Sequence, residues 1–315
     1  MNKLQEINSE DKWVFIVNPV AGNGYAKTSI PVIREMTLKY KIDAEIKITE
    51  YPGHASLISQ EYCRKGFRYI IGVGGDGTIN EVAAPLSGLK NVILGAVPAG
   101  TGNDLIQIMG FPGRFTEKEW EILFRHPTIR IDAGEVNGKL FLNGMGLGFD
   151  AQVASENYVE PGKVKKGGAH KYIWHIIKTL LFFREKKMII INDGQRNETD
   201  CFINTVSNGR RFAGGFFLTP GALADDGLLD VCSIKRLNLF HRFRLLLKVP
   251  KGKHIYDKRV RYFKTASLDI EFPEEVPFHV DGELNFSQRF SIRIIPGAFN
   301  VIYNPDGNHF FTKNN

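Results

Sequence analysis

The stretch IGVGGDGTINEV, residues 71–82, contains a cluster of glycines around a single aspartate. The segment before the cluster, residues 67–73, is short, apolar and rich in β-branched and aromatic side chains, which predicts a buried strand. The segment after it has the i, i+3, i+4, i+7 apolar spacing of an amphipathic helix, at Ile79, Val82, Ala83 and Leu86. Residues 74–77 are therefore predicted to form a strand-to-helix turn.

Glycine in such a turn permits positive φ and leaves no Cβ between the backbone and a ligand. The first N–H groups of a helix lack partners within the helix and carry a partial positive charge, so this turn can form a phosphate site. A tight structural turn, in which Asp76 only caps the helix, explains the same four residues equally well. Other features of the sequence are needed to distinguish these two interpretations.

The N-terminal part of the chain alternates predicted strands and helices. Strands are expected at residues 13–19, 43–50, 67–73 and 91–100, and helical patterns connect them. This alternation predicts a doubly wound α/β domain with a mostly parallel sheet. Ligands of such sheets bind at the carboxyl ends of the strands.

After about residue 130 the chain changes to short apolar runs separated by Gly, Asn and Asp, which predicts an antiparallel β domain. Helical inserts are expected near 168–185 and 238–248. We therefore expect an α/β domain at 1–130, with the tail 303–315 packing back on it, and a β-rich domain at 131–302.

Three glycine-rich turns follow strands of the first domain, at residues 18–22, 74–78 and 98–104. Three such turns in one α/β domain indicate a shared phosphate site. No GxxxxGK[ST] pattern occurs, and GxGxxG fails at the first turn because Lys27 stands at the third glycine position. A GxGxG at residues 144–148 lies outside a predicted strand–turn–helix context and is a weak indication of a dinucleotide site.

The composition is that of a globular protein, with 315 residues, 43% hydrophobic and 24% charged. The three cysteines are far apart in sequence and suggest neither a zinc site nor a disulfide framework. The longest apolar stretch, residues 172–183, is interrupted by His175 and Lys178 and is shorter than the ~20 residues that a membrane span needs. We interpret it as a helix that faces the core, with an acyl-chain entrance as the alternative.

The net charge of +7 is unevenly distributed. Between Val231 and Lys264, Asp257 is the only acid among eleven Lys and Arg residues, and a second basic cluster spans 163–187. Such clusters attract phosphates, nucleic acid or anionic membranes, although a solvated basic face explains any single lysine.

GGDGTINEV followed by PAGTGNDL resembles the diacylglycerol kinase catalytic superfamily, which includes diacylglycerol, sphingosine and ceramide kinases. The similarity continues through NPVAG, IDAGEVNG, NGMGLGFDAQV, ADDGLLDV and VDGE, in the expected order over nearly the whole chain. The length resembles the bacterial lipid kinase branch. The resemblance implies an N-terminal α/β domain like that of NAD kinase and phosphofructokinase, and a C-terminal antiparallel β-sandwich-like domain.

The resemblance also implies ATP as the phosphoryl donor and a set of residues that bind it. That set comprises Asn18, Pro19, Gly22, Thr49, Gly74, Gly75, Asp76, Gly77, Thr78, Asn80 and Thr101. Asp76 is an unsuitable direct ligand for phosphate because like charges repel, so it is expected to hold Mg²⁺ through water or to orient the turn.

Further acids match the metal network of the family, with Asp104 and Asp132 as supporting positions. By position in the family's structural metal loop, Asp226 would give a carboxylate, and Leu223 and Leu228 would give main-chain carbonyls. Oxygen ligands of this kind suit Mg²⁺. An ordinary Asp-Asp-Gly turn is the alternative interpretation of this loop.

Glu283 matches the proposed general base of the family, because a positioned carboxylate can take the proton of a lipid hydroxyl during attack. The alternative is a surface glutamate in a β-turn. The sequence thus predicts an ATP- and Mg²⁺-dependent lipid kinase, cytoplasmic and peripherally associated with an anionic membrane. Nucleic acid is not expected as a partner, and a homodimer is left open. A kinase of a soluble substrate, similar to NAD kinase, and a non-catalytic nucleotide- or lipid-binding regulator are the alternatives.

Overall fold

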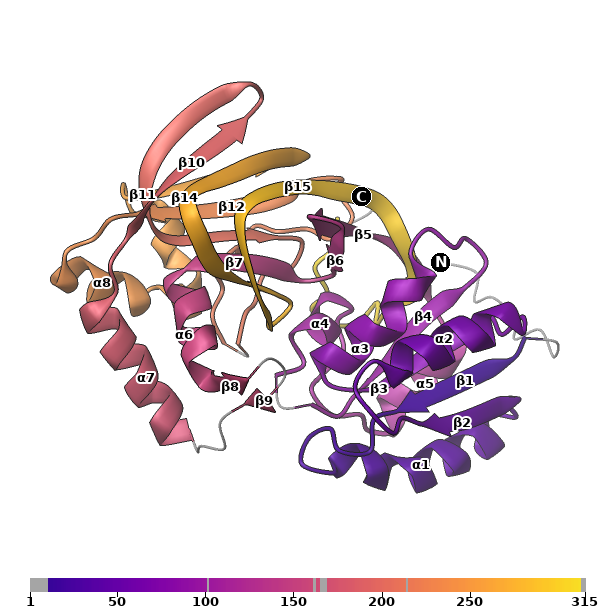
Figure 1. Ribbon diagram of the computed structural model, residues 1–315. Coiled ribbons are helices and arrows are strands. Elements are labelled where there is room, and N and C mark those ends of the chain that lie inside the picture. Colours follow the sequence, from indigo (N-terminus) through magenta and orange to yellow (C-terminus); the bar gives the residue numbers. More distant parts are fainter. Residues whose placement is uncertain (1–10, 101, 161–162, 165–168, 214, 313–315) are drawn as a thin grey trace. The chain divides into compact units, whose positions relative to one another are not determined.

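A computed structural model describes residues 11–100, 102–160, 163–164, 169–213 and 215–312 (Figure 1). The chain forms two compact units. Unit 1 comprises Met1–Ala133, Ala224–Asp226 and Pro296–Asn315, and unit 2 comprises Gly134–Leu223 and Gly227–Ile295. The expected boundaries, 130 and 302, differ from these. Residues 296–302 belong to unit 1 because Asn300 and Val301 pair with the strand that begins at Ile93.

Unit 1 is built on a parallel sheet in the order β15–β4–β3–β1–β2. Its own strands are β1 (Trp13–Val17), β2 (Ala44–Ile48), β3 (Tyr69–Gly74) and β4 (Ile93–Pro98), and the last residues of β15 (Glu283–Ile302) complete it. Every residue of β1, β3 and β4 is buried. Such continuously apolar strands are expected where helices cover both faces of a parallel sheet.

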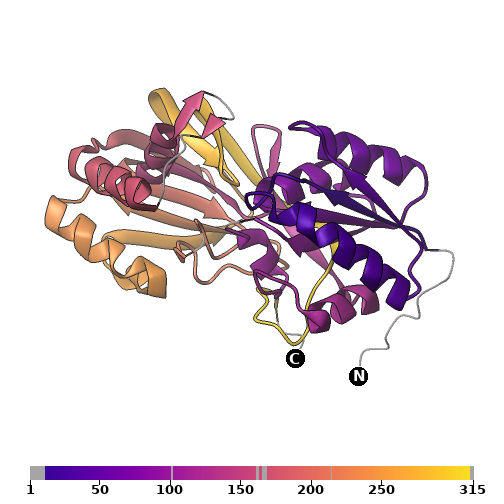
Figure 2. The same ribbon diagram turned by 90° about the horizontal axis from the view of Figure 1, so that it is seen from below.

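The helices of unit 1 are α1 (Tyr25–Lys39), α2 (His54–Arg64), α3 (Asp76–Ala83), α4 (Asp104–Ile108) and α5 (Glu117–Arg125), with the short turn η1 (Ala84–Leu86). On one face of the sheet, Trp13 and Phe15 pack against Phe124 and Trp120 of α5. On the other face, Ile79 and Val82 of α3 approach β3 so closely that a Cβ on Gly72 would lie 3.1 Å from Ile79. Figure 2 shows helices on both sides of this sheet. The predicted doubly wound arrangement is thus present in unit 1.

Unit 2 is built on antiparallel strands in the order β13–β12–β11–β10–β14–β15, and β7 pairs with both β11 and β14. These strands are β7 (Gly144–Gly148), β10 (Lys186–Asn192), β11 (Gln195–Ser207), β12 (Leu229–Lys235), β13 (Val260–Thr265) and β14 (Ser267–Val280). The remaining strands are β5 (Thr128–Val136), which begins in unit 1 and ends in unit 2, and the short strands β6 (Lys139–Phe141), β8 (Tyr158–Glu160) and β9 (Lys163–Val164). The core of unit 2 includes Phe141, Leu147, Val231 and Phe290.

Three helices accompany this sheet: α6 (Phe149–Asn157), α7 (Ala169–Phe182) and α8 (Leu239–Leu246). Two short turns follow α8, η2 (Val249–Lys251) and η3 (Lys253–Tyr256). The two predicted helical inserts correspond to α7 and α8. The sequence pattern did not predict α6, which begins directly after the glycine-rich strand β7.

The glycines of GxGxG are explained by packing inside unit 2. A Cβ on Gly146 would lie 2.1 Å from Asp150 Oδ2 and 2.3 Å from His279 Nε2, two atoms that lie 3.3 Å apart. Gly148 has φ +93°. The motif therefore lets the first turn of α6 and the strand β14 approach β7 closely, which is a structural role and not a dinucleotide site.

In the part of the chain that the structure describes, no helix combines the length and the apolarity that crossing a membrane requires.

Candidate functional site

The carboxyl ends of the four strands β1 to β4 lie at one edge of the parallel sheet, where Asn18, Thr49, Gly75 and Ala99 follow them. Backbone hydrogen bonds join these ends: Asn18 N–H donates to Val73 O (3.0 Å), and Ala99 N–H donates to Gly74 O (2.7 Å). Thr49, which is buried, donates its N–H to Val17 O (2.9 Å). Predicted residues from separate segments are thus held at the edge where α/β sheets bind ligands.

The NPVAG turn contacts both other glycine-rich turns. Asn18 Nδ2 donates to Thr78 Oγ1 (2.9 Å), which links the first turn to α3. Gly22 has φ +60°, and a Cβ there would lie only 2.1 Å from Ala99 O. The glycine is therefore required both by its backbone conformation and by the close approach of the third turn. Pro19 lies inside this turn, next to Asn18.

The GGDG turn leads directly into α3. Gly75 is the N-cap residue and no side chain caps the helix, so the first N–H groups of α3 remain directed out of its N-terminus. A Cβ on Gly75 would lie 3.1 Å from Gly100 Cα, and one on Gly74 would lie 2.5 Å from Thr78. At Gly77, in contrast, no atom lies within 4 Å of the Cβ position. This combination of bare N–H groups and open space suits an anion.

Two carboxylates approach the backbone after β4. Asp76 Oδ1 accepts a hydrogen bond from Leu105 N (2.9 Å), which ties the GGDG turn to the first turn of α4. A Cβ on Gly102 would lie 3.2 Å from Asp76 Oδ2 and 4.0 Å from Asp104 Oδ2. Asp76 is half-buried and Asp104 is buried. Both carboxylates therefore flank the same short backbone segment beside the glycine turns.

The remaining predicted positions of unit 1 are more dispersed. Asp132 is buried: its Oδ1 accepts from Gly297 N, and its own N–H donates to Ala224 O, both at 2.7 Å. The first bond anchors the last part of β15 to Asp132, and the second anchors the segment that contains Ala224. Asn80 lies in α3, and its buried Oδ1 has no hydrogen-bond partner among the described residues. Thr101 lies outside the described residues.

Arg114 is a cation near these turns that the sequence motifs did not indicate. Its Nη1 lies 3.1 Å from Gly113 O and 3.4 Å from Gly100 O, and its guanidinium stacks 3.9 Å above the ring of Tyr25 at the start of α1. An exposed guanidinium in this place can attract phosphate. The dipeptide Pro112-Gly113 before it, which indicates a turn, was the only local signal.

Glu283 is exposed at the start of β15 in unit 2. It follows a two-residue turn in which Asp281 (φ +47°) and Gly282 (φ +89°) both adopt positive φ. The Asp281 carboxylate accepts three backbone N–H groups, from Leu142 (2.8 Å), Asn143 (3.1 Å) and Gly144 (2.7 Å). Asp281 therefore fixes the turn that presents Glu283, a positioning role that the sequence pattern did not reveal.

The segment 222–230 contains the predicted metal loop. Asp225 anchors the C-terminal tail, because its carboxylate accepts from both Thr312 N and Thr312 Oγ1 at 2.6 Å. Asp230 is completely buried and accepts from the Tyr262 hydroxyl, and burial together with the Asp230 charge raises the pKa of Tyr262.

Asp226, the predicted carboxylate ligand of this loop, is half-buried, and so are Leu223 and Leu228. No group of three or more His, Cys, Asp or Glu side chains suited to a metal occurs within the described ranges. The predicted loop differs from such a group, because it would offer one carboxylate and two main-chain carbonyls.

Glycine turns at the carboxyl edge of a parallel sheet, a bare helix N-terminus and two nearby carboxylates are typical of enzymes that bind nucleotide phosphates. Comparisons with known proteins agree with this class. Residues 12–136 match the model of the diacylglycerol kinase catalytic domain, and residues 144–303 match that of the YegS C-terminal NAD kinase beta sandwich-like domain.

Relatives resemble the whole chain. A diacylglycerol kinase of Bacillus subtilis (strain 168) is 29% identical, with 91% of this chain and 92% of the relative covered. A probable lipid kinase YegS-like of Citrobacter koseri is 30% identical, with coverages of 84% and 88%. A crystal structure of a diacylglycerol kinase from Bacillus anthracis str. Sterne has a TM-score of 0.73 and 25% identity, with 94% of this chain and 97% of that chain covered.

The chain therefore belongs to the diacylglycerol kinase catalytic superfamily, in its bacterial lipid kinase branch. It is a lipid kinase, a phosphotransferase with a hydroxyl group as acceptor.

Proposed function

We propose that this kinase transfers the γ-phosphoryl group of ATP to the hydroxyl of a diacylglycerol-like lipid, and that it does so as a cytoplasmic protein bound peripherally to a membrane. The observation that carries the proposal is the junction of three glycine turns, through the Asn18–Thr78 hydrogen bond and the Gly22–Ala99 approach, at the ligand-binding edge of the unit 1 sheet. Similarity to a protein named diacylglycerol kinase supports the choice of acceptor.

In this proposal the ATP phosphates bind at the N-terminus of α3. The N–H groups of Gly77 and Thr78 donate to phosphate oxygens, and Arg114 adds positive charge from the side of Gly100. The other positions implied by the family, among them Asn18, Thr49 and Asn80, shape the surrounding pocket. We also propose that unit 1 shares the NAD kinase and phosphofructokinase-like arrangement that the sequence suggested.

Mg²⁺ fits the carboxylates near the GGDG turn. Asp76 and Asp104 both approach the backbone at Gly102 and offer the oxygen ligands that Mg²⁺ prefers. Magnesium bound there would neutralise phosphate charge during transfer. A second, structural Mg²⁺ would be held by the Asp226 carboxylate with the carbonyls of Leu223 and Leu228, and Asp132 would support the acidic network through its anchoring bonds.

Glu283 is proposed as the general base that takes the proton of the acceptor hydroxyl. Its exposure leaves the carboxylate accessible to an incoming lipid, and the Asp281 clamp restricts the movement of the turn that carries it. A homodimer remains a prediction from the sequence.

The function is tested by incubating the protein with labelled ATP and Mg²⁺ in three parallel reactions, containing mixed micelles of a bacterial lipid extract, NAD, or sugar phosphates. We expect label only in the lipid fraction, and mass analysis of the product should identify a phosphorylated diacylglycerol. Label on NAD or on a sugar phosphate would instead support a soluble-substrate kinase. ATP binding without transfer to any acceptor would support a regulator.

The metal loop is tested by comparing Asp226→Ala with Asp225→Ala. Wild-type melting temperature should rise with Mg²⁺, because a ligand that binds only the folded state stabilises it. Asp226→Ala should lower the melting temperature in Mg²⁺ and abolish most of this rise, with partial recovery at high Mg²⁺. Asp225→Ala should lower the melting temperature by several degrees at every Mg²⁺ concentration, because it breaks two hydrogen bonds to Thr312. Equal Mg²⁺ dependence in wild type and Asp226→Ala would contradict the metal assignment.

A further inference from the structure

Two helices of unit 2, α7 and α8, expose large apolar side chains to solvent. On α8 and the residue after it, the exposed positions Phe240, Phe243 and Leu247 follow the i, i+3, i+7 spacing of one helical stripe. On α7, Trp174 and Phe182 are exposed to 64% and 73%. Clusters of exposed apolar side chains on a folded protein mark interaction surfaces. The prediction that residues 172–183 form a core-facing helix therefore holds for one side only. Among the described side chains of this segment, Leu180 packs into the core, whereas Trp174 and Phe182 face solvent.

The buried side of α8 carries a charge. Arg242 is 7% exposed and donates to Leu180 O (2.6 Å), Phe183 O (3.0 Å) and the Glu185 carboxylate (2.7 Å). A rotation of α8 that buried its apolar stripe would break this buried ion pair, which is strongly destabilising. The outward direction of Phe240 and Leu247 is therefore fixed by the fold. Because Arg242 binds the carboxyl end of α7, it also holds the two helices side by side.

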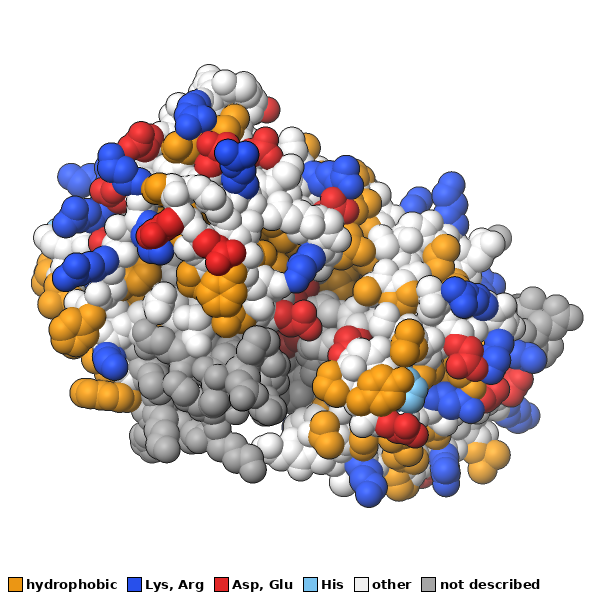
Figure 3. Space-filling model, in the orientation of Figure 1, with side chains coloured by type: hydrophobic (Ala, Val, Ile, Leu, Met, Phe, Trp, Pro, Cys, Tyr) orange, Lys and Arg blue, Asp and Glu red, His pale blue; other side chains and the backbone are white. Residues whose placement is uncertain are grey.

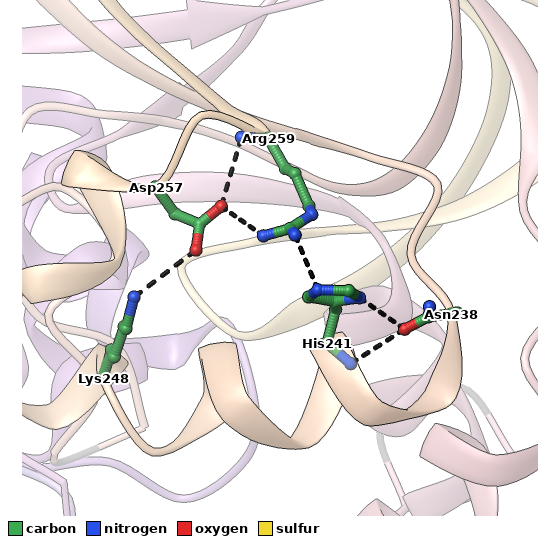
Figure 4. Close-up of polar contacts among 5 residues, drawn as sticks. All are labelled: Asn238, His241, Lys248, Asp257 and Arg259. Atoms are coloured by element: carbon green, nitrogen blue, oxygen red, sulfur yellow. Dashed lines mark hydrogen bonds and ion pairs between the residues drawn. The ribbon is translucent and has the colours of Figure 1, made fainter.

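A polar network fixes both ends of α8 (Figure 4). The N-cap residue Asn238 accepts from His241 N (3.0 Å), and His241 Nε2 accepts from Arg259 (2.6 Å). Arg259 and Lys248 both pair with Asp257, at 2.7 Å and 3.4 Å. Since Arg has no acceptor, His241 must be protonated at Nδ1, which lies against Asn238 Oδ1. The network ties both ends of α8 to the segment 257–259. It also pairs Arg259 and Lys248 with Asp257, the only acid between Val231 and Lys264.

Other cations around the two helices remain without an ion pair among the described residues. These cations are the exposed residues Lys178, Arg236, Arg244, Lys251, Lys253 and Lys258. Neither α7 nor α8 contains an acid. Figure 3 shows hydrophobic side chains together with Lys and Arg over α8 and the visible part of α7, at the left edge of the view. Exposed apolar side chains accompanied by cations are the composition of helices that lie in the interface of an anionic bilayer.

We propose that α7 and α8 form the membrane-docking surface of this kinase, and that Trp174, Phe182, Phe240 and Leu247 enter the interfacial layer of an anionic bilayer. This inference rests on the proposed function at a membrane surface. A second copy of the chain is a poorer occupant of the same surface, because pairing two such faces would bring their cations together.

The apolar part is tested with Leu247→Ser and Phe240→Ser in a double variant, by sedimentation with vesicles of phosphatidylglycerol and phosphatidylcholine. We expect the apparent affinity to fall by roughly 10- to 100-fold, from the apolar area that no longer leaves water. The matched control is Leu38→Ser, which changes a leucine of equal exposure (81% against 80%) on helix α1 of unit 1. Unchanged vesicle binding by the double variant would overturn the proposal, and so would an equal loss in the control.

The contributions of charge and of insertion can be measured separately with the same vesicles. Lys251→Gln with Lys253→Gln should remove most of the salt-sensitive part of binding and leave a salt-resistant part. Trp174 is the exposed one of three tryptophans, since Trp13 and Trp120 are buried. Vesicles should therefore shift the emission of the wild type to the blue, and Trp174→Phe should abolish this shift. A shift that persists in Trp174→Phe would contradict insertion at α7.

The two proposals fail in different ways. The helix variants should phosphorylate a short-chain, monomeric diacylglycerol at the wild-type rate and lose activity only on vesicles. No activity of the wild type on any lipid would refute the proposed function, while the sedimentation result still tests docking. A wild type that ignores vesicles but forms a dimer, with monomeric helix variants, would assign the surface to self-association and overturn the proposal.

Discussion

Replacing Glu283 by glutamine should lower the turnover number of lipid phosphorylation by roughly 10²- to 10⁴-fold, the usual contribution of a positioned general base. Glutamine keeps the shape of the side chain but cannot accept the proton of the acceptor hydroxyl. The melting temperature and the ATP affinity should hardly change, because Glu283 is exposed and its carboxylate has no hydrogen bond or ion pair among the described residues. Steady-state kinetics with a verified lipid acceptor, together with thermal melts, measure the effect.

Glu275→Gln provides the matched control, since Glu275 is an exposed acid of the neighbouring strand β14. It should keep wild-type turnover. Asp281→Asn should lower turnover as well as stability, because a neutral amide binds the three backbone N–H groups of residues 142–144 less strongly. Near wild-type turnover of Glu283→Gln would remove Glu283 as the base and make Asp76 the leading alternative.

Gly77→Ala should reduce kcat/KM for ATP by about 100-fold, the loss that a displacement of about 1 Å causes in a positioned substrate. The Cβ of a helical residue tilts towards the helix N-terminus, which is where the phosphate is proposed to lie. The fold should tolerate the change, because no atom lies within 4 Å of the new Cβ. Alanine is also the better helix former, so the melting temperature should stay equal or rise slightly.

Gly77 is a sharper probe than Gly75, where a new Cβ would lie 3.1 Å from Gly100 and a loss of activity would have two explanations. Gly215→Ala is the control, since it adds a methyl group in equally open space in unit 2. Isothermal titration calorimetry measures the affinity for ATP, and initial rates at varied ATP concentration give kcat/KM. If ATP kinetics stayed normal, the GGDG turn would have only a structural role.

Much of the architecture could be predicted from local pattern. The alternation of apolar strands with helical periods predicted the parallel sheet of unit 1, because continuous apolar runs such as residues 13–17 and 69–74 are stable only between two layers of helices. The change to short runs separated by turn residues predicted the antiparallel unit 2. The helix α6 was not predicted, because its nine residues have almost no amphipathic pattern and directly follow a glycine-rich strand.

The candidate site was predictable where a motif carries its chemistry in consecutive residues, as in GGDG and DGE. Arg114 and Asp281 were not, because their roles depend on contacts with residues that lie far away in sequence or in other turns. Asp281 meets residues 142–144 more than 130 positions away. Arg114 matters because the chain brings it beside Gly100 and Tyr25.

The sequence by itself determined the family, the two-part architecture and the glycine turns, since these depend on local conformational preference and on motifs read in order. Only the tertiary structure decided which turns touch, as at Gly22 and Ala99, and which face of a helix points outward. Periodicity shows that α7 and α8 have apolar stripes but does not orient them. The buried pairing of Arg242 with Glu185 orients α8, because a charge taken into the interior must keep its partner. The apolar stripe of α8 is therefore left in solvent.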